Sequence, residues 1–417
     1  MQDAAQTIGI RGGQIESAYA WLRLLAAVLL GTLGSVGMWA GVVTLPAVQA
    51  DFGISRADAS LPYTLTMIGF GGGAVVIGGF VDRLGIVRPL TGAALLLGAG
   101  FITSGFAPSL LPFALASLAI GIGSSAGFAP LIADISHWFN RRRGIAVAVC
   151  ASGNYIGGAV WPPIVQYLLD AAGWRPTQIL IGIICIATML PLAQVLQGRL
   201  STEEVHDDSV VADSARASLG LHPYALFVLL CLAGLACCLA MSMPQVHIVA
   251  YCSDLGYGAA RGAEMLSLML GFGIISRIGS GFVADRIGGV ATLLAGSVMQ
   301  AAALLLYLVF DGLTPLYVIS VLFGLFQGGI VPMYAIIVRE YFPPRQAGTL
   351  VGLVIMSTIA GMALGGWMSG AIFDLTGSYW QAFASGFLWN LLNIAIMLFL
   401  RSRRAGRPQG FERAATA

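Results

Sequence analysis

The sequence predicts an all-α membrane protein with twelve transmembrane helices in two six-helix pseudo-symmetric halves. Three observations predict it. Hydrophobic residues make up 58% of the 417 residues and charged residues only 10%, whereas soluble domains carry roughly a quarter charged residues. The chain also contains repeated apolar runs, each long enough to cross a bilayer with about 20 residues. Finally, polar motifs of the first half recur in the second half, which indicates an internal duplication.

The apolar runs give the individual helices in order. They fall at about 24–48, 60–81, 89–107, 110–135, 145–168, 176–197, 222–250, 263–283, 290–310, 314–338, 347–372 and 380–400. Several contain Pro or many Gly, which membrane helices tolerate where neighbouring helices satisfy the backbone. The first run is longer than the apolar core of a signal peptide, so we expect a retained helix.

Charge predicts the orientation. All 21 basic residues are Arg, and 17 of them fall in cytoplasmic segments if the N-terminus lies inside. Arg56, Arg175 and Arg261 then face outside, and Arg277 lies within a helix. This asymmetry follows the positive-inside rule. It predicts that both termini are cytoplasmic. The helix pattern and the exclusive use of Arg point to a multi-pass protein of the cell inner membrane, in contact with the lipid bilayer. Because the arginines lie at helix ends, they indicate no contact with nucleic acid.

The two halves match at an offset of about 203 residues. The matching segments are Asp51–Gly53 with Asp254–Gly256, Gly78–Gly85 with Gly281–Gly288, Phe139 and Arg142 with Phe342 and Arg345, and, one residue displaced, Asp170–Gly173 with Asp374–Gly377. Four matches in the same order indicate duplication. The predicted parts are an N-terminal six-helix half (1–198), a cytoplasmic linker (199–221), a C-terminal six-helix half (222–401) and a basic cytoplasmic tail (402–417).

One loop carries a family resemblance. Gly78-x-x-x-Asp82-Arg83-x-Gly85 and its second copy before Gly288 resemble the signature of the major facilitator superfamily between its second and third helices. The resemblance covers nearly the whole chain, and it implies that these loops latch the cytoplasmic side shut. The expected gating residues are Asp82, Arg83, Asp285, Arg286 and Arg142. The alternative is a simple turn whose arginines set the topology.

Glycines four residues apart let helices approach closely. Such pairs occur at Gly69 and Gly73, at Gly153 and Gly157, and at Gly361 and Gly365. In the resembled family the second helix faces the eleventh and the fifth faces the eighth. We therefore expect these pairs to support packing between the halves, with generic packing as the alternative.

Arg277 is the most informative candidate for substrate binding. It lies eight residues before Asp285, which corresponds to about 12 Å of helix. An Arg at this depth costs about 2.5–3.5 kcal/mol to insert, so it should face a cavity and meet an anion. A substrate carboxylate would match its two-pronged guanidinium. The alternative is a structural pair with a distant acid, Asp134 or Glu264.

Three segments sharpen the resemblance. Ser276-Arg277-x-x-x-Gly281 resembles the eighth helix of monocarboxylate porters and oxalate/formate exchangers, which use an Arg there for the substrate carboxylate. The stretch 137–146 and the segment 374–383 resemble the sequences after the fourth helix and before the twelfth helix of the same proteins. This chain departs from the animal porters in having no Lys, and Gly273 stands where they carry an Asp.

The sequence thus predicts a secondary active transporter that moves a small organic anion, a monocarboxylate, with a proton by alternating access. Carrying a lone monoanion inward against the membrane potential costs about 2.3 kcal/mol per 100 mV, and one proton removes that cost. The candidate proton sites are His247 and Asp134, although His247 could equally be a structural residue and Asp134 could pair with Arg141–Arg143. Asn154, Gln327 and Tyr334 are polar groups at depth that could contact substrate.

The alternatives are an organic-anion exchanger of the oxalate/formate type or a drug/proton antiporter on the same fold. The pattern that such antiporters show has an Arg where this chain has Ser117 and a Pro where it has Asn154. The sequence therefore disfavours the antiporter. The chain shows no nucleophile–base motif and no metal-ligand spacing, and its cysteines form no disulfide framework. We therefore expect no enzyme activity, no cofactor and no metal, and a protein that functions as a monomer.

Overall fold

The computed structural model describes residues 16–139, 142–198, 221–342 and 344–405, and these residues form helices and connecting turns without any strand. Within these described ranges, twelve segments are long and apolar enough to cross a membrane, which confirms the predicted fold class. The first six segments contain α1 (Ala18–Gly34), α2 (Val36–Phe52), α3 (Arg56–Leu84), α4 (Val87–Gly105), α5 (Leu110–Ser125), α6 (Ala129–Trp138), α7 (Arg143–Ala172) and α8 (Trp174–Gln194). The last six contain α10 (Pro223–Asp254), α11 (Ala259–Ile287), α12 (Gly289–Val309), α13 (Leu313–Gln327), α14 (Ile330–Tyr341), α15 (Pro344–Thr376) and α16 (Tyr379–Ala405).

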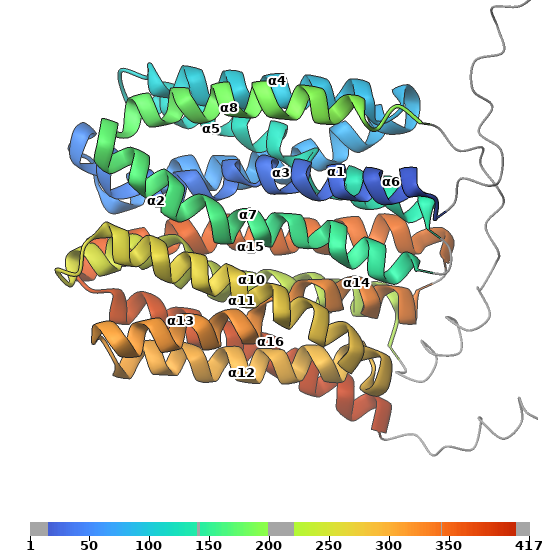
Figure 1. Ribbon diagram of the computed structural model, residues 1–417. Coiled ribbons are helices and arrows are strands. Elements are labelled where there is room, and N and C mark those ends of the chain that lie inside the picture. The colour runs from blue at the N-terminus through green and yellow to red at the C-terminus, as the bar shows by residue number, and fades with distance from the viewer. Residues whose placement is uncertain (1–15, 140–141, 199–220, 343, 406–417) are drawn as a thin grey trace, which may run out of the picture. The chain divides into compact units, whose positions relative to one another are not determined.

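Three of the membrane segments are each built from two helices (Figure 1). The first segment changes helix at Ser35, the fourth between Ser125 and Ala129, and the tenth between Gln327 and Ile330. The last two breaks are related by the duplication, because Ala126 and Gly329 are 203 residues apart in the sequence. Interrupted helices at corresponding positions of two repeats are typical of the binding region of secondary transporters.

The chain folds into two compact units. The first unit is formed by the described parts of Met1–Glu204 and Val246–Ile274, and the second by those of Val205–Gln245 and Ile275–Ala417. The boundary between the units therefore crosses α10 after Gln245 and α11 after Ile274. The predicted division into halves at the linker stays a prediction.

In the first unit, α3 packs against α5, α4 lies along α8, and α1 lies along α7. Glycine makes all three crossings close, and Gly69 and Gly153 are examples. A Cβ on Gly69 would lie 2.3 Å from the carbonyl oxygen of Leu118 on α5. A Cβ on Gly153 would lie 2.8 Å from the carbonyl oxygen of Val28 on α1. These distances leave no room for a side chain.

In the second unit, α12 lies along α16, and α15 packs closely on α10. A Cβ on Gly361 would lie 2.3 Å from the carbonyl oxygen of Leu235 on α10. The expectation that the paired glycines join the two halves is therefore wrong for Gly69, Gly153 and Gly361. The short approach that each provides lies within its own bundle of helices, where backbones must pack most tightly.

The duplicated motifs also end helices. Gly85 and Gly288, the last glycines of the two signature loops, have φ angles of 75° and 82°. Residues with a Cβ rarely adopt this backbone conformation, so glycine is the residue that allows the chain to turn there. The backbone N–H of Gly85 still donates to the carbonyl of Val81, which caps α3. The signature loops thus have a structural role in addition to any role in gating.

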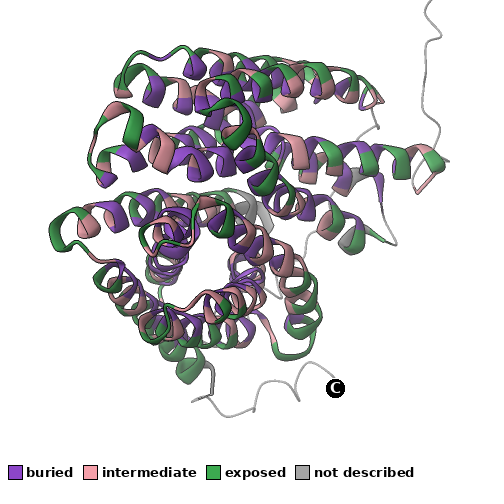
Figure 2. Ribbon diagram, turned by 60° about the vertical axis from the view of Figure 1, so that its left-hand side comes forward, coloured by how far each residue is buried: buried purple, intermediate pink, exposed green. Residues whose placement is uncertain are grey.

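Large apolar side chains lie on the surface of the helices as well as between them. Figure 2 shows buried and exposed residues alternating along the same helices. Phe282 of α11 is 67% exposed, and Leu111 of α5 and Leu388 of α16 are similarly exposed. An apolar surface of this extent suits contact with lipid tails rather than water.

Candidate functional site

Arg277 lies at the break in the tenth membrane segment. Its side chain is partly buried, and its Nε donates a hydrogen bond to the carbonyl oxygen of Gly328 at 3.4 Å. The neighbouring Ser276 accepts a hydrogen bond from the backbone N–H of Gly329 through its Oγ at 3.1 Å. Two consecutive residues of α11 therefore bond the two residues that separate α13 from α14.

The break explains why these polar contacts form inside a membrane segment. Helix ends leave backbone N–H and C=O groups without partners in the helix, and in lipid these groups must find partners elsewhere. The carbonyl that Arg277 contacts follows the C-terminal end of α13, where the helix dipole favours a cation. The N-terminus of α14 begins two residues later at Ile330, and a helix N-terminus favours an anion. The guanidinium of Arg277 and the N-terminus of α14 together create a region of positive electrostatic potential.

The first repeat has the same crossing without the charge. The residues that correspond to Ser276 and Arg277 are Gly73 and Ala74 of α3. A Cβ on Gly73 would lie 2.7 Å from the Oγ of Ser125, the last residue of α5 before its break. The contact between α3 and the end of α5 therefore forms without a cation. This indicates that the equivalent contact of α11 does not require Arg277 for packing, and that Arg277 has a different role.

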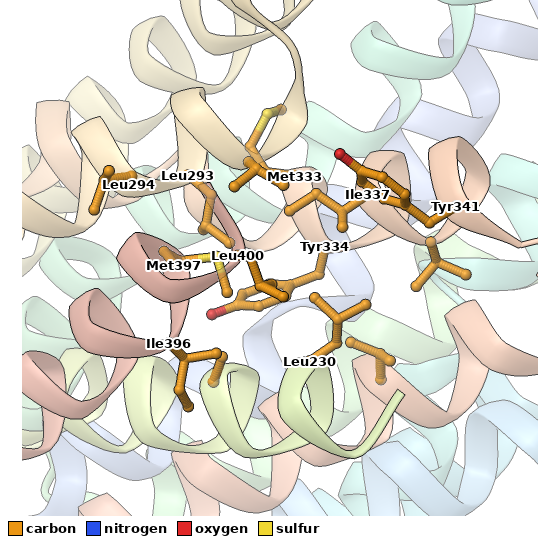
Figure 3. Close-up of a cluster of buried hydrophobic side chains, with 14 of the residues drawn as sticks. Leu230, Leu293, Leu294, Met333, Tyr334, Ile337, Tyr341, Ile396, Met397 and Leu400 are labelled. Atoms are coloured by element: carbon orange, nitrogen blue, oxygen red, sulfur yellow. The ribbon is translucent and has the colours of Figure 1, made fainter. Parts of the chain in front are cut away.

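Tyr334, the second predicted substrate contact, lies in a different environment of the same unit. Its side chain is fully buried in an apolar cluster with Leu230, Met397 and Leu400 (Figure 3). Its hydroxyl donates to Oδ1 of Asn393 at 3.0 Å. Asn393 in turn donates to Oγ of Ser297 at 2.7 Å. These bonds tie α14 to α16 and α12, so the contacts of Tyr334 are those of a structural residue.

Asn154, the third predicted substrate contact, belongs to the first unit. Its side chain is 9% exposed, and its Nδ2 lies 3.3 Å from the sulfur of Met38 on α2. A thioether is a weak acceptor, so this amide retains much of its hydrogen-bonding capacity. Within the second unit, Arg277 contacts the helix break, whereas Tyr334 bonds Asn393.

His247, a predicted proton site, is fully buried in the first unit. Its Nε2 lies 3.5 Å from Oγ of Ser60 on α3. One helical turn earlier on α3, Arg56 bonds both carboxylate oxygens of Asp254 at 3.1 and 3.2 Å. Arg56 and Asp254 are therefore charged groups close to His247 along α3 and α10.

Asp134, the other predicted proton site, forms a two-pronged ion pair. Its two oxygens accept hydrogen bonds from Nε and Nη2 of Arg23, both at 2.7 Å. The Arg23 guanidinium also lies 4.6 Å from the ring centroid of Trp138 and donates to the hydroxyl of Tyr19 at 3.2 Å. Arg23 is thus the partner of Asp134 among the described residues, and the side chains of Arg141 and Arg143 lie outside them. The sequence did not indicate this role, because the apolar run of the first predicted helix starts at residue 24, directly after Arg23.

The predicted gating residues lie at helix ends. Arg83, Asp285 and Arg286 are exposed, and the side chain of Asp82 lies outside the described residues. The backbone N–H of Arg142 donates to Oε1 of Glu16 at 2.8 Å, and its guanidinium lies 6.0 Å from the ring centroid of Trp21. These contacts hold the segment before α1 against the start of α7.

Comparisons with known proteins agree with this architecture. The profile of the family described as Major Facilitator Superfamily matches residues 27–313 and again residues 230–417. Monocarboxylate transporter 13 of Bos taurus is 26% identical over 408 residues, which cover 94% of this chain and 93% of that protein. Monocarboxylate transporter 11 of Homo sapiens is 26% identical over 396 residues, covering 89% and 80%. The fold is similar to the crystal structure of a bacterial homolog of the human lysosomal transporter Spinster in an inward-facing, unoccupied conformation, with a TM-score of 0.70, 16% identity, and coverage of 93% of this chain and 96% of that one.

Proposed function

Because this chain belongs to the Major Facilitator Superfamily and is a multi-pass membrane transporter, we propose that its cargo is a small organic anion with one carboxylate. The family resemblance predicted from the sequence is confirmed by the same match. Two relatives that align with most of this chain are named monocarboxylate transporters. That agreement supports the cargo class.

The contact of Arg277 with Gly328 carries the proposal. It holds a cation inside a membrane segment, and ionisable residues at such depth mark substrate or ion pathways. A carboxylate between this guanidinium and the N-terminus of α14 would gain charge-assisted hydrogen bonds from the first and a favourable dipole from the second. The one guanidinium that contacts this helix break suits one carboxylate rather than two.

We propose that a proton accompanies the anion and that His247 carries it. Histidine is the side chain that gains and loses a proton most readily near neutral pH. Both oxygens of the other candidate, Asp134, are already bonded to Arg23. The protein works, in this proposal, by alternating access in the cell inner membrane with both termini cytoplasmic. Asp82, Arg83, Asp285, Arg286 and Arg142 then act at the cytoplasmic gate.

Uptake by reconstituted vesicles tests the role of Arg277. Arg277→Ala and Arg277→Lys are expected to abolish carboxylate uptake, because Lys keeps the charge but lacks the planar fork. Arg261→Ala is the matched control on the same helix, since Arg261 is exposed and bonds Glu264 three residues later. Uptake by Arg277→Ala at the rate of the Arg261→Ala control would exclude the proposed site.

A proton gradient tests the coupling. An inward gradient should drive accumulation of the carboxylate, and a protonophore should reduce the accumulated level to equilibrium. His247→Gln, which keeps a polar group beside Ser60, should exchange the carboxylate across the membrane but fail to concentrate it. Full accumulation in the presence of the protonophore would contradict symport while leaving the cargo class intact.

A further inference from the structure

Two buried glutamines meet beside the helix break that Arg277 contacts. Gln245 lies on α10 and Gln327 is the last residue of α13, directly before Gly328. Their side chains are 1% and 0% exposed. The Nε2 of Gln245 donates to Oε1 of Gln327 at 3.0 Å. The amide pair therefore stands one residue away from the carbonyl that Arg277 bonds.

Each amide of the pair keeps one buried atom without a hydrogen bond among the described residues. These atoms are Oε1 of Gln245, an acceptor, and Nε2 of Gln327, a donor. The assignment of oxygen and nitrogen within an amide is an interpretation of the hydrogen-bond network. Exchanging both assignments would still leave one donor and one acceptor, so the conclusion does not depend on it.

Such a pair is unusual in a well-packed interior. Buried polar groups are nearly always bonded, and each exception calls for an explanation. Gln178 and Asn390 are also buried, and the fully buried atom without a partner is in each case the acceptor oxygen. Orphaned buried donors are rarer than under-satisfied acceptors. At Gln245 and Gln327 both kinds occur together, inside a membrane segment where water is scarce.

We propose that Gln245 and Gln327 determine specificity by binding a second polar group of the substrate that both donates and accepts a hydrogen bond. A hydroxyl or a primary carboxamide has this chemistry, whereas a methyl group has neither capacity and a ketone only accepts. The inference rests on the proposed function, because Arg277 then holds the carboxylate of the same molecule. Binding separates the two amides and satisfies both orphaned atoms.

The test compares unbranched acids of three to six carbons with their ω-hydroxy and ω-carboxamide counterparts. Dissociation constants come from the ligand-dependent rise in unfolding temperature of the purified full chain in detergent. The wild type is expected to bind a hydroxy or carboxamide acid at least about tenfold more tightly than the plain acid of equal length. The series that shows the preference identifies which of the two groups is recognised.

Variants assign the preference to the glutamines. Gln327→Leu should remove the tenfold preference. Gln245→Met provides a second variant, because methionine fills irregular space without polar hydrogen-bonding groups. Gln178→Leu on α8 is the matched control, a buried glutamine with one orphaned atom, and it should keep the preference.

Failure of this inference differs from failure of the proposed function. Equal binding of plain and polar acids by the wild type, or an unchanged preference in both glutamine variants, overturns the specificity role. If the wild type binds the acids and Arg277→Ala does not, the proposed carboxylate site at Arg277 is still supported. If the wild type binds none of the acids, or if Arg277→Ala binds them all normally, the cargo assignment falls and this inference falls with it.

Discussion

Arg23 and Asp134 form a two-pronged ion pair at the predicted cytoplasmic end of the first unit, with both bonds at 2.7 Å. The Arg23 side chain is 1% exposed and that of Asp134 is 16% exposed. The second unit has no ion pair at the corresponding positions. The residues 203 positions later are Leu226 and Ile337, both fully buried in its apolar cluster. At this pair of positions, the first repeat therefore has an ion pair and the second repeat has two apolar side chains.

This difference predicts a stability pattern. Arg23→Leu alone should lower the free energy of unfolding by about 3–5 kcal/mol, because it leaves the partly buried carboxylate of Asp134 without its cation. The double variant Arg23→Leu with Asp134→Ile copies the second repeat and should recover most of that loss. Thermal unfolding of the purified variants measures both effects. A double variant no more stable than Arg23→Leu would show that the site needs the charges themselves.

Arg56 and Asp254 form an ion pair that ties α3 to α10, with 10% and 35% of their side chains exposed. Removing one charge by Asp254→Asn should cost about 1 kcal/mol or less, as is usual for partly exposed pairs. Exchanging the charges by Arg56→Asp with Asp254→Arg should restore part of the interaction, which a double-mutant cycle measures. Asp51→Asn is the control, because Asp51 is the repeat mate of Asp254 and pairs instead with Arg175 within the first repeat. A charge exchange that fails to restore stability would indicate that the pair contributes nothing.

Gly69 and Gly72 of α3 should respond oppositely to the same substitution. A Cβ on Gly69 would lie 2.3 Å from the backbone of α5, whereas nothing lies within 4 Å of a Cβ on Gly72. Gly69→Ala must push two backbones apart and should destabilise the protein by about 1–3 kcal/mol. Gly72→Ala should be neutral or slightly stabilising, because Ala favours the helix. Unfolding temperatures in detergent provide the comparison, and equal temperatures would refute the close approach.

Tyr334→Phe separates a structural role from substrate contact. Loss of the hydroxyl leaves Oδ1 of Asn393 without its donor, so the free energy of unfolding should fall by about 1–3 kcal/mol. If Tyr334 is only structural, the dissociation constant for carboxylates should stay unchanged once measured below the unfolding temperature. Weaker carboxylate binding with unchanged stability would instead place its hydroxyl in the substrate site, as the sequence prediction holds.

The sequence by itself determined the membrane fold. Twelve apolar runs, few charges and the offset repeat suffice because lipid allows few backbone structures and because helix length must match the bilayer. The duplicated motif also placed Gly85 and Gly288 in connections between helices. The sequence also identified Arg277 as a candidate site residue, because the cost of placing a charge at that depth in the membrane does not depend on which residues surround it.

The tertiary structure decided which residues meet. The pairing of Asp134 with Arg23, the packing of Gly69 on α5 and the contact of Arg277 with Gly328 all join residues far apart in the chain. A pattern of apolar residues gives the length of a helix but not its rotation, and rotation selects the partners. Whether Oε1 of Gln245 and Nε2 of Gln327 have hydrogen-bond partners depends most strongly on this rotation, since a hydrogen bond forms or is lost over a fraction of an ångström.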